Sequence, residues 1–255
     1  MRDFTLRKYQ ELCDTLFHHD YSVLTVYDYL VRNRNDPDPD ENTVVLRHDV
    51  DRKLHSATRM ANLEKAMGIR STYYFRYPYT FHPDTLIEIH GLGHEIGYHY
   101  EVLAKTRGNA EQAIQLFERE LSIMRETCEI HTICMHGSPL SRFDNRALWD
   151  HYDFRDFGII GEAYLSMNTM HYYSDTGRSW NAQYSLRDMV NSGSRGKGPE
   201  TTDELIDTIV SQRENPLYIS IHPERWNDSL AEWYRGYLRD FIFNTGKRVI
   251  IRLRT

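Results

Sequence analysis

Short apolar runs alternate with amphipathic stretches along most of the chain. Apolar, β-branched runs bounded by turn residues predict buried strands, and apolar residues at helical spacing predict helices packed on a core. The predicted strands are residues 43–48, 71–75, 95–99, 132–135, 157–161, 170–174, 217–222 and 249–253. The predicted helices are residues 4–18, 26–31, 54–67, 83–91, 109–127, 144–151, 202–211 and 229–244.

This order of elements predicts a single α/β domain over residues 1–255. Strands that alternate with helices form βα units and a largely parallel sheet. A chain of 255 residues has the ordinary length of one α/β barrel. Residues 1–42 are predicted to form a helical extension before the first core strand, and residues 176–200, rich in Gly and Ser, a surface loop.

The composition is that of a globular protein, with 40% hydrophobic and 27% charged residues. A formal net charge of −6 argues against a nucleic-acid partner, which requires a basic face. The three cysteines, Cys13, Cys128 and Cys134, lack metal-site spacing and are expected to be reduced thiols of a cytoplasmic protein. The first residues lack the apolar core of a signal peptide, and no apolar run is long enough to predict a membrane span.

The first core strand ends in His48-Asp49-Val50-Asp51. Alternate residues of an extended strand point the same way, so Asp49 and Asp51 can face one cavity. Active sites of α/β folds collect at the C-terminal ends of strands, which favours a functional pair over the alternative of a capped turn. Histidines also end other predicted strands, at His99, His136 and His222.

One carboxylate and two imidazoles leave positions open on a divalent metal, as catalytic sites require. Such a metal lowers the pKa of a bound water to about 7 and polarises a carbonyl. A free carboxylate can then take a proton, and a histidine can protonate the leaving group. The predicted chemistry is metal-assisted hydrolysis of an amide or ester, with zinc as the expected metal.

These segments resemble the polysaccharide deacetylases, carbohydrate esterase family 4, from about Thr43 to His222. The resemblance implies a distorted barrel of about seven βα units, a (β/α)7-type fold. Asp49 and Asp51 match the Asp-x-Asp motif of the family, which implies that Asp49 is the base and Asp51 a metal ligand. His99 ends a segment that matches the second motif, which implies a metal ligand, and His222 matches the acid of the last motif.

The chain departs from the family pattern at two places. The second motif of the family has another metal-binding histidine four residues after the first, where this chain has Leu103. The third motif begins with arginine and proline, where this chain has His136-Gly137-Ser138-Pro139. We infer that His136 supplies the missing imidazole, with Glu101 as the second candidate. Arg47 is expected either to hold Asp49 in its ionised form or to be a charge at the sheet edge.

Two further segments could bind a sugar. Asp175, Arg178 and Trp180 offer hydrogen bonds and aromatic stacking, or they form a hairpin turn with a solvated arginine. Arg225 and Trp226 follow His222 and are expected to line the same rim. The expected substrate is a small or lipid-linked acylated sugar, because the resemblance is to a divergent subgroup associated with surface-polysaccharide (lipopolysaccharide) biosynthesis.

The expected function is therefore removal of an acyl group from an N- or O-acylated sugar by a metal-dependent hydrolase. The departure at Leu103 favours an alternative, a non-catalytic carbohydrate-binding or assembly protein on the same barrel. A different enzyme on this scaffold, such as a cyclic amidase, is a third hypothesis. Stoichiometric metal would separate the enzymes from the binding protein.

Overall fold

A computed structural model describes residues 2–35, 42–138, 141–185, 187–188, 198–212 and 215–254. Its strands are β1 Ser22–Leu24, β2 Thr43–Val50, β3 Thr72–Phe75, β4 Glu95–Tyr100, β5 Thr132–Met135, β6 Gly161–Glu162, β7 His171–Ser174 and β8 Leu217–Ile221. The α-helices are α1 Leu6–His18, α2 Val26–Asn35, α3 Leu54–Ala66, α4 Pro83–Gly91, α5 Val102–Lys105, α6 Ala110–Arg125, α7 Thr202–Gln212 and α8 Leu230–Arg254. Short 3-10 helices are η1 Asn145–Asp150, η2 Phe154–Phe157 and η4 Pro223–Arg225.

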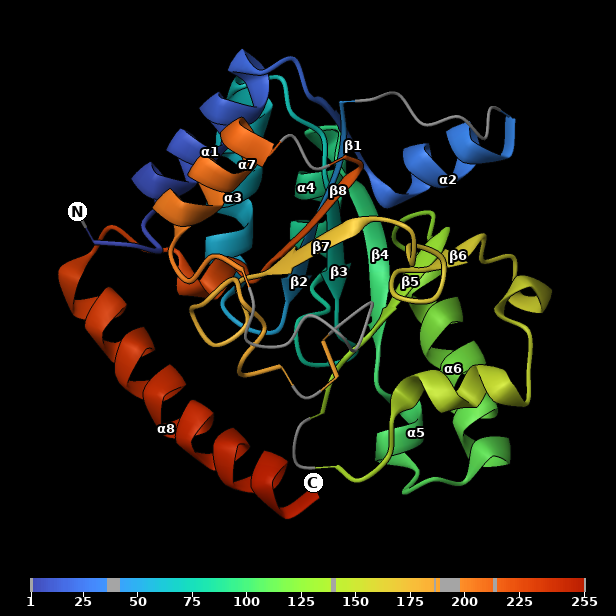
Figure 1. The fold of residues 1–255 in the computed structure, drawn as a ribbon. Coiled ribbons are helices and arrows are strands. Elements are labelled where there is room, and N and C mark those ends of the chain that lie inside the picture. Colours follow the sequence, from blue (N-terminus) through green and yellow to red (C-terminus); the bar gives the residue numbers. More distant parts are fainter. Residues whose placement is uncertain are drawn as a thin grey trace.

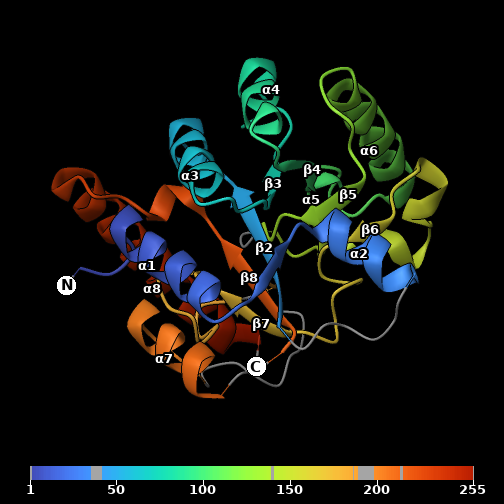
Figure 2. The same ribbon diagram turned by 90° about the horizontal axis from the view of Figure 1, so that it is seen from above.

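The strands form one curled sheet in which every described pairing is parallel. The strand order is β6-β5-β4-β3-β2-β8-β7, and β1 pairs with the first residues of β2. Among the described strands β6 and β7 are the two edges, so the curled sheet is an open half-barrel. This confirms the parallel α/β barrel-type fold expected from the alternation of strands and helices. Figure 2 shows helices arranged around the outside of the sheet.

Alternate residues of β2 serve the two faces of this sheet. Arg47 donates to the Tyr218 hydroxyl of β8 at 2.8 Å, which places it on the inner face. His48 contacts Glu64 of α3 at 2.6 Å, which places it on the outer face under that helix. Both faces are buried, and the burial pattern of β2 is continuous. The two-residue period of the strand therefore sends Asp49 inward with Arg47.

Glu64 is a buried carboxylate that joins the outer face of the sheet to α3. It is 0% exposed, and it accepts hydrogen bonds from Ser71 (2.6 Å), Tyr73 (2.8 Å) and Tyr9 of α1. Burial alone would raise the pKa of Glu64, but His48, His94 and Ser71 outweigh it and lower the pKa to about 2. His94 Nε2 donates to the Ala61 carbonyl at 3.0 Å, and its Nδ1 lies 3.6 Å from Glu64, so this histidine has a structural role outside the cleft.

Replacing Glu64 by glutamine is expected to lower the free energy of unfolding by about 3 kcal/mol, because the buried hydroxyl and imidazole donors around it lose a charged acceptor. The urea midpoint, followed by circular dichroism, measures this change. Glu118→Gln, at an exposed position of α6, is the matched control and should leave the midpoint nearly unchanged. Equal midpoints for the two variants would show that the buried carboxylate does not stabilise the fold.

Several predicted elements were wrong. Residues 249–253, expected to be a strand, continue the helix α8, and most of residues 157–161 lies outside the two-residue strand β6. The N-terminal region was expected to be only helical, but it also contributes β1 to the sheet. Residues 36–41, within the predicted loop at 33–42, and much of 186–197 in the predicted loop at 176–200 lie outside the described residues.

Helix α8 runs along one side of the molecule, apart from the helices that cover the sheet (Figure 1). Several of its large apolar side chains are exposed, among them Leu238 (60%), Phe241 (60%) and Ile242 (62%). No helix within the described ranges has the length and hydropathy needed to cross a membrane. Three residues of α8, Asp240, Phe243 and Asn244, line the cleft at the end of the sheet.

Candidate metal centre and hydrolytic site

The C-terminal ends of β2, β4, β5 and β8 open into one cleft of about 350 Å³. Asp49, Asp51, His99, His136 and His222 all line it. The sheet register explains this convergence, since Asp49 pairs with Tyr74 of β3, Tyr74 with Gly97 of β4, and His99 with Cys134 of β5. Side chains at the ends of neighbouring parallel strands therefore meet at one edge.

Asp51, His99 and His136 form a group that could hold a metal ion. Their ligand atoms lie within 4.8 Å of one another. The Asp51 Oδ1 atom is 3.5 Å from His99 Nε2 and 3.3 Å from His136 Nε2. This oxygen is buried and accepts no hydrogen bond of acceptable geometry from the described residues. A buried oxygen without a partner, facing two imidazole nitrogens, fits a divalent metal.

Outer contacts fix the orientation of both imidazoles. His99 Nδ1 donates to the Cys134 carbonyl at 3.0 Å, and His136 Nδ1 donates to Glu101 Oε2 at 2.9 Å. Each ring therefore directs its Nε2 lone pair towards Asp51, as metal-ligating histidines commonly do. Glu101, the second candidate for the third ligand, lies outside the group and also pairs with Arg76 at 2.8 Å.

The carboxylates of Asp51 and Glu101 favour a positive charge at His136, which lies in contact with both. Burial would lower the pKa of His136, but the carboxylates of Asp51 and Glu101 outweigh it and raise the pKa to about 9. Burial would raise the pKa of Glu101, but His136 and Arg76 lower it to about 2. The pKa of Asp51 is likewise held well below its usual value, because the two histidines outweigh burial. The same carboxylates would stabilise a metal cation bound between Asp51 and the two histidines.

Asp49 lies on the floor of the cleft, where its side chain is 2% exposed. Its Oδ2 is 3.3 Å from Arg47 Nη2 and 3.5 Å from the Ser220 hydroxyl. The Arg47 side chain is fully buried and is also held by the hydroxyls of Tyr218 (2.8 Å) and Tyr172 (3.1 Å). Of the two hypotheses for Arg47, the structure therefore matches contact with Asp49 and not a charge at the sheet edge.

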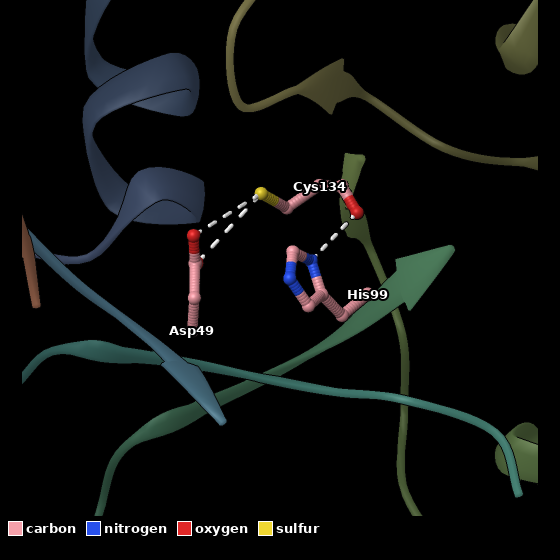
Figure 3. A group of neighbouring side chains, drawn as sticks. All are labelled: Asp49, His99 and Cys134. Carbon is pink, nitrogen blue, oxygen red and sulfur yellow. Dashed lines mark hydrogen bonds between the residues drawn. The ribbon is translucent and has the colours of Figure 1, made fainter. Parts of the chain in front are cut away.

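A second possible ligand group shares His99 with the first. It consists of Asp49, His99 and Cys134, which point towards one another in Figure 3. The Cys134 thiol is 3.7 Å from Asp49 Oδ1 and 3.9 Å from Oδ2. Burial raises the pKa of this thiol well above its usual value, and the acids around it add to the effect of burial while Arg47 opposes it. The neutral thiol favoured there is a hydrogen-bond donor to Asp49 and a poor metal ligand.

His222 lies at the end of β8 and is held by Asp175. Its Nδ1 is 2.6 Å from Asp175 Oδ1, and its backbone NH donates to Asp175 Oδ2 at 3.0 Å. Burial and Arg225 would lower the pKa of His222, but Asp175 outweighs them and raises it. A histidine with one nitrogen on a carboxylate and a raised pKa is suited to donate a proton from its Nε2.

Four of the five residues expected to bind sugar do not line the cleft. Asp175 is 0% exposed and binds His222, Arg225 (2.7 Å) and the indole NH of Trp226 (2.8 Å), so a substrate cannot reach it. Trp180 and Trp226 are 2% and 1% exposed and pack with each other in the core. Their rings are therefore not free to stack on a sugar.

The two arginines of the predicted sugar site differ in position. Arg178 pairs with Asp240 of α8 at 2.8 Å and does not line the cleft of the metal group, so it is neither a solvated turn residue nor at the rim. Arg225 does line the cleft, although its side chain is mostly buried. Among the five predicted sugar-binding residues, Arg225 is the one that the structure places in the cleft wall.

Sequence reasoning missed three residues around Asp49. Cys134 and Ser220 contact its carboxylate, and Asp188 lies 3.8 Å from Arg47. Asp188 also accepts hydrogen bonds from Ser174 (2.6 Å) and Tyr164 (2.8 Å) and lines the cleft. The two-residue period of β5 and β8 marks Cys134 and Ser220 as neighbours of His136 and His222 on the same face. No such signal exists for Asp188, which lies in a loop.

No family model matches the chain, and no curated protein matches its sequence. Solved structures do match. The structural neighbours include proteins of carbohydrate esterase family 4. One is a pseudoenzyme of this family from Bacillus anthracis (TM-score 0.48, 11% identity, covering 79% of this chain and 61% of that chain). Others are a peptidoglycan deacetylase from Bacillus subtilis (0.45, 13%, 82% and 86%) and a family 4 carbohydrate esterase from Bacillus anthracis (0.41, 12%, 80% and 76%). TM-scores below 0.5 and identities of 11–13% indicate a similar path of the backbone and say nothing of activity.

Proposed function

We propose that the protein is a metal-dependent hydrolase that removes the acyl group from an N-acylated sugar. The observation that carries the proposal is the group of Asp51, His99 and His136, with Asp51 Oδ1 buried and unpartnered between two oriented imidazoles. Two nitrogen ligands and one carboxylate are a set typical of catalytic zinc, so zinc is the proposed metal. The resemblance of the motifs suggests surface-polysaccharide biosynthesis as the setting, in the cytoplasm.

Asp49 and His222 would divide the proton transfers between them. When bound, the metal polarises the acyl carbonyl and lowers the pKa of a water to about 7. Asp49 then accepts a proton from the attacking water, held for this role by Arg47 and Ser220. His222, whose pKa the Asp175 carboxylate raises, donates a proton to the departing amine. Both residues line the cleft that the metal group occupies.

A second candidate function is binding without catalysis. It is favoured by Leu103, which stands where the resembling family has a metal-binding histidine and which is 6% exposed within the hydrophobic core. His136, directly after β5, offers an imidazole to the same group. A binding protein would retain the sugar without releasing acetate, so turnover separates the two functions.

Acetate release from UDP-N-acetylglucosamine, a probe with an N-acetyl sugar, tests the proposal. We expect release by the zinc-loaded protein, its loss after EDTA treatment, and its return when zinc is added back. N-acetylglucosamine oligosaccharides and an O-acetylated sugar are assayed in parallel, because the proposal fixes the reaction and not the substrate. Absence of acetate from all three classes, with one zinc per chain bound, would refute catalysis and favour the binding protein.

Asp175→Asn is expected to move the alkaline limb of the pH–rate profile to lower pH. The carboxylate raises the pKa of His222, and an acid catalyst works only while protonated, so activity falls as the pH passes the pKa of His222. A neutral asparagine removes that rise. Asp207→Asn, an exposed position on α7, is the control and should leave the limb in place. An unchanged limb in Asp175→Asn would argue that His222 is not the acid.

A further inference from the structure

A group of arginines lies beside the metal group, between the end of β2, η4 and α8. Arg52 directly follows Asp51, and Arg225 follows His222 by three residues; both line the cleft. Arg239 lies on α8, next to the cleft-lining Asp240. Arg52 lies 3.4 Å from Glu224, the residue before Arg225, and Arg239 lies 3.9 Å from Asp240. Burial lowers the pKa of Arg239, and the charges of Arg52 and Arg225 act in the same direction, whereas Asp240 and Glu224 oppose them.

The acids of this region balance the arginines only in part. Asp175 is within 2.7 Å of Arg225, and Asp240 is within 2.8 Å of Arg178. Arg239 is 3.9 Å from Asp240, beyond a hydrogen bond.

Arg52 has a long contact of 3.4 Å with Glu224. Of these arginines, Arg52 and Arg239 have the longest distances to a carboxylate.

Several guanidinium nitrogens in this group are buried without a hydrogen-bond partner among the described residues. They are Arg52 Nε, Arg225 Nε, and Nε and Nη2 of Arg239. Glu224 Oε2 is also unpartnered, but a single carboxylate oxygen cannot satisfy these donors. Arg225 is 6% exposed, so water has little access to it. Arg52 and Arg225 line the cleft, and Arg239 is adjacent in the chain to Asp240, which also lines it. Buried donors without partners at a cleft indicate a ligand that accepts several hydrogen bonds.

We propose that Arg52, Arg225 and Arg239 form a subsite for a phosphate or diphosphate attached to the sugar. Planar guanidiniums match phosphate oxygens in pairs, and a phosphate supplies the several negatively charged acceptors that these unpartnered donors lack. This inference rests on the proposed function and narrows its substrate to a phosphate-linked acyl sugar. The phosphate can come from a nucleotide or from a lipid diphosphate, and the exposed apolar side chains of α8 make the second source worth testing.

Binding of inorganic pyrophosphate to the full-length, zinc-loaded protein tests the subsite by calorimetry. We expect the dissociation constant to rise at least tenfold in Arg52→Gln and in Arg239→Gln, with zinc content unchanged. Arg119→Gln, an exposed arginine of α6, is the matched control and should bind as the wild type does. If the two subsite variants bind like this control, the anion is held by the metal alone and the proposal is overturned. Tighter binding of glucuronate than of pyrophosphate would also overturn it, because the site would then select carboxylates.

Two further probes identify the source of the phosphate. Tenfold tighter binding of UDP than of pyrophosphate would assign the subsite to a nucleotide, and tighter binding of geranyl diphosphate would assign it to a lipid. These measurements require no turnover, so they separate the subsite from the proposed hydrolysis. Acetate release together with pyrophosphate binding that does not depend on the arginines would support the hydrolase and refute the subsite. Arginine-dependent binding without acetate release would support the subsite and refute the hydrolase.

Discussion

Asp49→Asn is expected to lower acetate release by about a thousandfold, within the range found for loss of a general base. Asparagine has the shape of aspartate but cannot accept the proton of the attacking water. Zinc content should stay at one per chain, because Asp49 lies outside the group of Asp51, His99 and His136. Steady-state kinetics with elemental mass spectrometry measure both quantities on the same sample.

The fold is expected to survive this change. Arg47 keeps its bonds to the hydroxyls of Tyr218 and Tyr172, so its charge is not left without partners. Asp207→Asn on α7 provides an isosteric control at an exposed position and should retain full activity. Bound zinc with unchanged turnover in Asp49→Asn would remove Asp49 from the role of base.

His136→Gln is expected to weaken zinc binding at least a hundredfold. The variant removes one of three ligands, and loss of even an outer partner of a ligand typically costs ten- to a hundredfold in affinity. The zinc dissociation constant, measured by competition with a chelator of known affinity, gives the size of the effect. Acetate release should fall in parallel at limiting zinc.

Two comparison variants make this result specific. His151→Gln, at an exposed position after η1, should bind zinc like the wild type. Glu101→Gln should weaken binding less than His136→Gln, because Glu101 contacts His136 Nδ1 and lies outside the ligand group. The reverse order of effects would make Glu101 the third ligand.

Most of the sheet could be predicted from the sequence because its central strands are buried on both faces. Residues 43–50 are buried throughout, with Val44, Val45 and Leu46 as their apolar run, and a parallel sheet covered by helices hides both faces. The same logic placed Asp49, Asp51, His99, His136 and His222 at strand ends. Their convergence in one cleft follows from the register, which the sequence pattern alone does not contain.

The remaining features depend on partners that lie far apart in the chain. Residues 249–253 are apolar enough for a strand, but α8 continues through them, and no described strand pairs with them. Asp175 resembles a surface acid in a turn and is instead buried by His222 and Trp226. Trp180 resembles a sugar platform and packs on Phe4 and Trp226, which are remote in sequence. Tertiary packing of this kind overrides local pattern.

The location of bound zinc, determined by anomalous diffraction at the zinc edge, tests the central claim most directly. The account predicts one peak with Asp51 Oδ1, His99 Nε2 and His136 Nε2 at about 2.0–2.2 Å. The two possible ligand groups share His99, so the position of the peak separates them. A peak about 2.3 Å from Cys134 Sγ, with Asp49 as a ligand and His136 beyond coordination distance, would contradict the account, because Asp49 could then not act as the base.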